Sequence, residues 1–580
     1  MTFSTKSITD APPRTRSDFQ EGVTTDVAII GGGVAGCYCA WRLAGEDLDV
    51  DLFESSGRLG GRLLSSPVPG TDLIAELGGM RYHTSHEITS SLIENVLALD
   101  WHRFRDGIDE TRFAYLRRKR VSAAISSVSS EQSCQSAYDI GESAQRLAPG
   151  VVFKMLAARV FLADSEVARR FRWKIHVYED DAELLLSRAD WDAIKQTLRY
   201  VRAGSAYDGM LVQDLGFQNV IKDQLSHEYY QYLADACGYY SDTQNWNAAE
   251  ALHYLIGDAE SASGEYRAIT GGYDELVTAL ARSGDDRVSR QTFWVENKLV
   301  SIRPGSERRY QLVLHNQITG AQWSVEADRV ILALPRRSIE LLDQTSFMFD
   351  VSQTGEFVGA LRSVQGAPAF KLVMLFDRAW WLDACGFEYG KSVTDLPLRQ
   401  CLYFGRDRHS GKALLLASYN DMSTVEFWRA LIPRDQSVAS RMSDRWVKLD
   451  RAPATAGATA LAPSEFRDPA WYPLIAEAVA ELSELHETDV PFPEAVAVMD
   501  WSADPYGGGY HAWLPRVGVK ETMERVRNPG YDMAIHVVGE AYSDRQGWVE
   551  GALCTAERCL QDVMGLEPPD WLNAAYYLGR

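Results

Sequence analysis

The sequence has no apolar run near the roughly 20 residues that a helix needs to cross a membrane. Its first residues, MTFSTKSITDAPPRTRSDFQEG, also lack the apolar segment of a secretion signal. Their Pro, Ser, Thr and charged residues predict a frayed arm over residues 1–22. We therefore expect no membrane partner and a cytoplasmic location.

Cysteine is also scarce, with 8 residues in 580, and the spacings match neither a zinc site nor a disulfide framework. We expect reduced thiols and no metal. Basic residues are outnumbered, 59 against 80 acidic ones, for a net charge of −21. Such a chain is repelled by nucleic acid, so the short basic run Arg117–Arg120 predicts a solvated surface. The length of 580 residues exceeds one ordinary core and predicts several domains.

One stretch near the N-terminus carries a strong chemical signal. The apolar run 27–30 predicts a buried parallel strand, and the next six residues fit G-x-G-x-x-G, with Val34 and Ala35 opening a helix. In this motif Gly31 permits a tight turn, Gly33 lets the backbone approach a pyrophosphate, and Gly36 allows close packing of helix and strand. The helix start then supplies N–H groups and a positive dipole for the phosphates.

A second apolar run, residues 50–53, ends at Glu54, which follows Gly33 by 21 residues. A carboxylate at this spacing accepts hydrogen bonds from the ribose of a dinucleotide. Ser55 comes next, and Gly61 and Arg62 then suit a second loop that wraps and neutralises a diphosphate. Together these features predict a dinucleotide site rather than a glycine-rich turn without a ligand.

The segment from Glu54 to Arg62, ESSGRLGGR, resembles the E-x-x-x-R-x-G-G-R segment of the FAD-dependent amine oxidase family. Further along, ELGGMR resembles that family's flavin-contacting strand in the form found in L-amino acid oxidases. The resemblance implies that Gly78, Gly79, Met80 and Arg81 contact a flavin.

The later segments extend the resemblance over most of the chain. It implies that the backbone near Val295 meets the adenine and that Glu540, after Gly539, binds the ribityl chain. Gly547 and Trp548 precede a helix that begins near Val549, whose positive end would face the flavin. The implied cofactor is FAD.

The resemblance implies an α/β fold, α+β overall, with a Rossmann-like FAD-binding domain. We expect a discontinuous FAD-binding domain, a mainly helical domain, a substrate-binding domain with an antiparallel sheet, and a short tail. The respective ranges are 23–85 with 265–335 and 496–565, then 86–264, 336–495 and 566–580.

Two residues are candidates for binding a substrate carboxylate. Arg81 suits this role because a guanidinium pairs bidentately with a carboxylate; the alternative is a structural arginine that pairs with Glu76 or with the FAD. Residues 394–403 are similar to the stretch in L-amino acid oxidases whose tyrosine binds the same group, which implies Tyr403. The alternative for Tyr403 is an ordinary tyrosine of the sheet.

The family resemblance also implies the groups at the reacting centre. Lys371, in an apolar strand, would hold a water at flavin N5 and assist O2; the alternative is a lysine at a sheet edge. Trp501 and Tyr510 would form one wall of an aromatic cage, with Trp548 as another, although an aromatic core competes for Trp501. Gly509 stands where monoamine oxidases carry a flavin-linking cysteine, so FAD is expected to be non-covalent.

The favoured function is an L-amino acid oxidase, in which FAD takes a hydride from the α-carbon and O2 reoxidises the flavin. The products are a 2-oxo acid, ammonia and hydrogen peroxide. We expect a homodimer. Tyr239, Tyr240, Trp246 and Trp548 are candidate pocket walls and favour broad specificity or large or aromatic side chains, whereas the acidic balance of the chain leaves lysine or arginine open. The alternatives are a tryptophan- or lysine-type 2-monooxygenase, a monoamine or polyamine oxidase, and a flavoprotein without catalysis.

Overall fold

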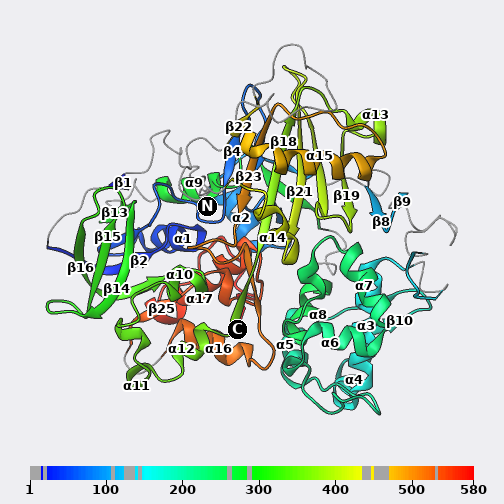
Figure 1. Cartoon of the computed structure of the whole chain (residues 1–580). Helices are drawn as coiled ribbons and strands as arrows, with labels where there is room; N and C mark the ends of the chain where they lie inside the picture. The colour runs from blue at the N-terminus through cyan, green and yellow to red at the C-terminus, as the bar shows by residue number, and fades with distance from the viewer. Residues whose placement is uncertain are drawn as a thin grey trace.

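The computed structural model describes residues 15–16, 22–105, 112–122, 137–141, 147–257, 264–283, 290–433, 446–449, 469–529 and 533–579. Figure 1 shows two sheets side by side, with a group of helices beneath the second sheet and the C-terminal helix near the centre. Chain segments that are far apart in sequence build each of the two sheets.

The first sheet has a parallel core. An antiparallel hairpin continues it beyond β16. Strand β2 pairs with residues 325–332 of β16, whereas β15 pairs with residues 322–327 and β25 with residues 330–332. The parallel strands are β1 (Thr15–Arg16), β13 (Gln291–Trp294), β3 (Val50–Phe53), β2 (Val23–Ile30), β16 (Gln322–Leu332) and β25 (Ile535–Val537). The hairpin strands are β14 (Asn297–Pro304) and β15 (Tyr310–Asn316).

Helices cover both faces of this sheet, and the alternation of side chains along β2 explains why. Val27 and Ile29 pack under one set of helices, whereas Ala28 and Ile30 pack on the other face. The first set is α1 (Val34–Leu43), α2 (Glu87–Ser91), α9 (Glu275–Ser283) and α17 (Val549–Met564). The opposite face carries α10 (Arg336–Glu340), α12 (Phe357–Leu361) and α16 (Val519–Arg527), and α11 (Val351–Thr354) contacts α12.

The second sheet is mainly antiparallel, and its order is β22-β23-β18-β21-β20-β19-β8-β9. One face packs against α15 (Tyr472–His486), with α13 (Trp381–Cys385) and α14 (Ser423–Arg429) beside it. The other face packs on Leu77 and Met80 of the FAD-type segment. The strands are β8 (Arg112–Leu116), β9 (Lys119–Ser122), β18 (Ala369–Phe376), β19 (Tyr389–Thr394), β20 (Gln400–Arg406), β21 (Ala413–Asp421), β22 (Trp446–Lys448) and β23 (Ala495–Asp500).

The helical part has one apolar core of its own. It comprises α3 (Pro149–Ala163), α4 (Ser165–Phe171), α5 (Arg188–Thr197), α6 (Phe217–Gln224), α7 (His227–Ala236) and α8 (Ala248–Gly257), with the hairpin β10 (Ile175–Val177) and β11 (Ala182–Leu184). Short strands connect the parts: β4 (Ser65–Pro67), β5 (Ile74–Glu76), β6 (Tyr82–His83), β7 (Trp101–Arg103), β12 (Tyr266–Ile269), β17 (Val364–Ala367) and β24 (Tyr510–Trp513).

The predicted fold class is confirmed, but the predicted domain ranges need adjustment. Within the range expected to be helical, α2 packs on α17, and β8 and β9 extend the second sheet. At the start of the expected substrate domain, α10 and α12 pack on the first sheet. The helical and strand periodicities of these segments carry no information about which sheet they join.

The expected N-terminal arm lies outside the described residues, apart from β1 and Gly22. The seven cysteines in the described ranges are free thiols. Among the helices described above, none is long and apolar enough to cross a membrane.

A buried carboxylate joins the two helices on which the candidate site depends. Glu557 of α17 accepts hydrogen bonds from the Tyr38 hydroxyl (2.6 Å) and from Arg42 Nε (2.9 Å) and Nη2 (3.1 Å), both on α1. The Glu557 side chain has no exposed surface. Because an unpaired buried charge is costly, this contact fixes the distance between the two helices.

Replacing Glu557 with Ala should destabilise the protein by about 3–5 kcal/mol, because Arg42 would keep a largely buried charge without its partner. Thermal unfolding would show a lower midpoint. The matched control is Arg558→Ala, one residue along the same helix in an exposed pair with Asp562, which should cost less than about 1 kcal/mol. Equal midpoints for the two variants would contradict this role of Glu557.

Candidate active site

Five loops begin together where the parallel strands of the first sheet end. Gly31 follows β2, Glu54 follows β3, Val295 follows β13, Ala333 follows β16 and Val538 follows β25. Hydrogen bonds between these positions lock the edge: Gly31 N–H donates to Phe53 O (2.8 Å) and Val538 N–H donates to Leu332 O (3.0 Å). A long cavity opens at this edge. Parallel α/β sheets bind ligands at such carboxyl edges.

The glycines of the first loop occupy positions that larger residues could not. Gly31 has a φ of +106°, and a Cβ there would lie 2.6 Å from Ala333 O. A Cβ on Gly36 would lie 1.9 Å from Gly31 O, so this glycine allows α1 to pack on β2. A Cβ on Gly33, in contrast, would meet nothing closer than Gly61 Cα at 3.9 Å, and Gly33 lines the cavity. The space beside the start of α1 therefore fits a pyrophosphate, as the motif predicts.

Glu54 lines the cavity and is held by the two glycine loops. Its Oε2 accepts the Gly32 N–H (2.7 Å), and its Oε1 accepts the N–H and hydroxyl of Ser56, both at 2.8 Å. Gly60 N–H donates to Gly32 O (2.8 Å), which ties the second loop to the first. That Glu54 binds the ribose stays a prediction. That the backbone near Val295 meets the adenine also stays a prediction, since Val295 is buried and is not part of the cavity wall.

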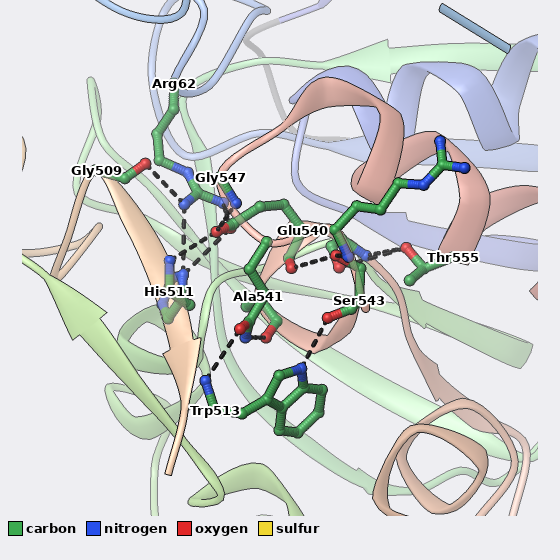
Figure 2. Close-up of polar contacts among 12 residues, drawn as sticks. Arg62, Gly509, His511, Trp513, Glu540, Ala541, Ser543, Gly547 and Thr555 are labelled. Atoms are coloured by element: carbon green, nitrogen blue, oxygen red, sulfur yellow. Dashed lines mark hydrogen bonds and ion pairs between the residues drawn. The ribbon is translucent and has the colours of Figure 1, made fainter. Parts of the chain in front are cut away.

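The half-buried Arg62 and the buried Glu540 form an ion pair at the cavity wall, with Nη2 to Oε2 at 2.8 Å (Figure 2). Arg62 Nη1 also donates to Gly509 O (3.1 Å). Glu540 Oε1 accepts the N–H groups of His511 (2.7 Å) and Gly547 (3.2 Å). Burial would raise the pKa of Glu540, but Arg62 and His511 hold it well below its ordinary value. The carboxylate is therefore ionised and joins three segments of the wall.

The start of α17 faces the cavity. This helix begins at Val549, as predicted, and Gly547, Trp548 and Val549 all line the wall. The Trp548 ring stacks on Tyr266 at 6.0 Å between ring centres and lies edge-on to His86 at 4.8 Å. These contacts fix the tryptophan at the positive end of the helix.

Arg81 lines the same cavity and lies over two aromatic rings. Its guanidinium carbon is 4.4 Å from the centre of the Tyr266 ring and 5.1 Å from that of Phe104. Tyr239 and Tyr419 also line the wall, with 5.1 Å between their ring centres. Burial raises the pKa of both phenols, and the charge of Arg81 opposes this rise, so both hydroxyls lie within its field. One cation and two hydroxyls thus share a compartment.

The structure corrects the prediction that Tyr403 belongs to the site. The Tyr403 hydroxyl is buried against His486 Nε2 (2.6 Å) and the Ser392 hydroxyl (2.9 Å), on the face of the second sheet that packs against α15. Its neighbour Leu402 faces the other way, toward the FAD-type segment. Because side chains alternate between the faces of a strand, Tyr403 lies on the wrong side to reach the cavity.

Tyr419 of β21 was not recognised from the sequence. The pairing of β18 with β21 shifts register between Leu372 and Val373, and this bulge changes the alternation of side chains. As a result, Leu416 and Tyr419 share the face toward the cavity although they are three residues apart. A bulge of this kind has no marker in the sequence.

Of the predicted aromatic residues, Trp501 stands behind the wall. Trp501 is buried, and its Nε1 donates to Leu77 O (2.8 Å), so it supports the flavin-type strand from behind. Tyr506, in edge contact with Trp501, lines the cavity instead, as does the predicted Tyr510. The alternative of an aromatic core therefore describes Trp501.

Lys371 lies directly behind the segment that contains Gly78, Gly79 and Met80. Its Nζ donates to Gly78 O (2.6 Å) and Glu76 O (3.1 Å) and lies 4.6 Å from the centre of the Tyr419 ring. Burial lowers the pKa of Lys371, while the Glu76 carboxylate opposes this shift. Gly79 and Met80 line the cavity, whereas Gly78 is not part of its wall.

The described residues include no group of three or more His, Cys, Asp or Glu side chains placed to hold a metal ion. The family model described as flavin containing amine oxidoreductase matches residues 34–443, more than half of the chain. The chain belongs to this amine oxidoreductase family. It is therefore an FAD-dependent oxidoreductase, and the predicted family and cofactor are confirmed.

Three relatives of this amine oxidoreductase match nearly all of it. Aplysianin-A of Aplysia kurodai is 25% identical over 576 residues, 94% of this chain and 91% of that protein. Achacin of Lissachatina fulica is 23% identical over 554 residues, 93% of each chain. L-amino-acid oxidase 4 of Hebeloma cylindrosporum is 21% identical over 580 residues, 94% of this chain and 82% of that protein.

Solved structures share its fold. A wild-type putrescine oxidase bound to putrescine superposes with a TM-score of 0.59 at 14% identity, covering 94% of this chain and 100% of that one. At this identity the likeness concerns the fold alone.

Two variants test whether Tyr419, rather than Tyr403, belongs to the site. Tyr419→Phe should lower kcat/KM by about 10- to 100-fold, because a hydroxyl that binds a charged group contributes about 1.5–3 kcal/mol. Tyr403→Phe should change kcat/KM by less than about threefold and lower only the stability, because its hydroxyl bonds lie in the core. Steady-state oxygen consumption measures the first quantity, and thermal unfolding the second. The reverse ranking of the two variants would restore Tyr403 to the site.

Proposed function

We propose that this protein is an L-amino acid oxidase that converts L-α-amino acids and O2 into 2-oxo acids, ammonia and hydrogen peroxide. Family membership supports the flavin chemistry, and the relative named L-amino-acid oxidase 4 supports the substrate class. The observation that carries the proposal is Arg81, a cation in the cavity wall beside two tyrosine hydroxyls.

A substrate carboxylate gives Arg81 a partner that a simple amine does not supply. A guanidinium binds a carboxylate through two parallel hydrogen bonds, and neighbouring hydroxyls can satisfy its remaining lone pairs. The rings of Tyr266 and Phe104 pack against the guanidinium, which lies in the cavity wall. This arrangement favours an amino acid over a monoamine or polyamine.

The chain's own residues bind and orient the reacting groups. When bound, FAD would supply the acceptor for a hydride from the substrate α-carbon and the electrons that reduce O2. Trp548 and Tyr510 line the cavity near the start of α17 and confine the α-carbon and amino group between aromatic walls. We assign Lys371 to hold a water and to provide positive charge where O2 is reduced.

In this proposal no residue of the described cavity wall is linked covalently to FAD. Gly509 lines the cavity and holds Arg62 through its carbonyl oxygen. The FAD is therefore proposed to be held by the glycine loops, Glu54, Arg62 and the start of α17 without a covalent bond. The homodimer and the cytoplasmic location stay predictions.

Arg81→Ala should lower kcat/KM for L-amino acids by about 30- to several-thousand-fold, because truncating one partner of a desolvated charge pair costs about 2–5 kcal/mol. Arg81→Lys should recover only part of this loss, since an ammonium lacks the planar fork. Oxygen-electrode kinetics and the flavin absorbance of both variants are the measurements.

Flavin content decides how the Arg81 result is interpreted. Normal flavin with lost turnover supports a substrate role, because the diphosphate contacts are assigned elsewhere. Loss of flavin in Arg81→Ala would make the residue a cofactor ligand. Normal flavin with full turnover of amino acids would remove the main support for the proposal.

Lys371→Met should slow reoxidation of the reduced enzyme by O2 at least about tenfold while leaving substrate affinity nearly unchanged. Methionine suits the apolar strand, so the change removes the charge with little loss of packing. Lys412→Met, directly before β21 of the same sheet, is the matched control, because Lys412 is only half-buried and pairs with Glu494. Unchanged stopped-flow reoxidation in Lys371→Met would refute the assigned role.

A further inference from the structure

The cavity also has an acidic residue in its wall, Asp242, which belongs to the short 3₁₀ turn η9 (Tyr240–Thr243). A second aspartate, Asp421 at the end of β21, lies behind it, is buried and accepts four hydrogen bonds. Its Oδ1 accepts the Tyr240 N–H (2.8 Å), and its Oδ2 accepts the Ser241 N–H (3.1 Å) and the hydroxyls of Ser241 and Tyr510. Asp421 therefore fixes η9 against the sheet and so determines the position of Asp242, which is part of η9.

Asp242 differs from Asp421 because it lines the cavity and is only half-buried. In the part of the chain that the structure describes, its carboxylate accepts no hydrogen bond. Lys391 and Arg399 attract it from a distance, but Arg399 donates to Thr394 O and Ala234 O instead. Burial, followed by the charge of Asp421, raises the pKa of Asp242 to about 8. A carboxylate in this setting gains from a bound cation more than a solvated one does.

The surrounding walls suit a cation as well. Tyr239, Tyr254, Tyr510 and Trp548 line the cavity with Asp242, and the faces of such rings attract positive charge. The Tyr510 phenol lies within the fields of Asp242 and Asp421. The Tyr419 phenol lies within the fields of both Arg81 and Asp421. The cationic and acidic sides therefore belong to one compartment.

We propose that Asp242 binds the side-chain cation of a basic L-amino acid, such as lysine, ornithine or arginine, while Arg81 binds its carboxylate. This inference rests on the proposed function and names its substrate class. It replaces the expectation of large or aromatic side chains, because an aromatic substrate would cover the Asp242 carboxyl group without giving it a hydrogen bond or a countercharge.

The chemistry of the α-amino group argues against the alternative that Asp242 binds the reacting amine. Oxidation requires the neutral amine, and a carboxylate beside an ammonium raises the pKa of that ammonium. Asp242 would then stabilise the unreactive form. A cation at the far end of the side chain carries no such penalty, since it keeps its charge throughout the reaction.

The test compares L-lysine with L-norleucine, which has the same carbon chain without the terminal amine. The wild type should prefer lysine by at least about 30-fold in kcat/KM, the effect of one desolvated charge pair. Asp242→Asn should remove most of that preference by lowering kcat/KM for lysine, with norleucine changed less than threefold. Asp242→Glu should restore part of it. Asp139→Asn, an exposed site outside the cavity wall, is the matched control.

The outcomes separate the inference from the proposed function. Equal losses for lysine and norleucine in Asp242→Asn, with normal flavin absorbance, would overturn the inference and assign Asp242 to the shared amino acid core. Equal kcat/KM values for norleucine and lysine in the wild type would also overturn the inference, but they would leave the proposed amino acid oxidase function intact. A wild type that oxidises no amino acid but oxidises amines would instead refute the proposed function.

Discussion

The ion pair between Arg62 and the buried Glu540 determines the shape of the site more than any other contact. Through it the second glycine loop, strand β24 and the loop before α17 meet at one point (Figure 2). An ionised carboxylate in a buried position is stable only while its donors stay in place. The position of Trp548 and the direction of α17 therefore depend on this contact, and so does the half of the cavity assigned to the flavin.

The other half of the cavity separates opposite charges. Arg81 stands on the FAD-type segment, whereas Asp242 belongs to the helical part and Asp421 to the second sheet. Tyrosine side chains between them carry hydroxyl groups rather than charges. Such a division suits a zwitterionic or dibasic substrate, because each charged group meets its complement on a different structural unit. It also explains why the site requires all three parts of the chain.

The sequence was sufficient for the parts of the site that depend on local backbone geometry. The tight turn at Gly31, the close packing at Gly36 and the helix start at Val549 follow from residue types at fixed spacing. Side chains on the second sheet could not be placed in this way. Tyr403 matched a family segment but points into the core, because each strand has two faces and the motif does not specify which one is buried.

Tyr419 and Asp242 were beyond sequence reasoning for a different reason. A bulge turns Tyr419 toward the cavity. Asp242 lies in the cavity wall because η9 packs on Asp421, which is 179 positions further along the chain. The same dependence on tertiary contacts explains the shifted domain ranges. Segments such as α2 and β8 have clear local periodicity, but the elements they join are determined by long-range packing.

The most direct test of the account is the rate of oxygen consumption on matched pairs of an L-amino acid and the amine formed by its decarboxylation. If Arg81 grips a substrate carboxylate, the preferred amino acid should exceed its amine by at least about 30-fold in kcat/KM. Hydrogen peroxide and ammonia should form in equal amounts. A preference for the amine would contradict the account, and an amide product in place of peroxide would make the protein a monooxygenase.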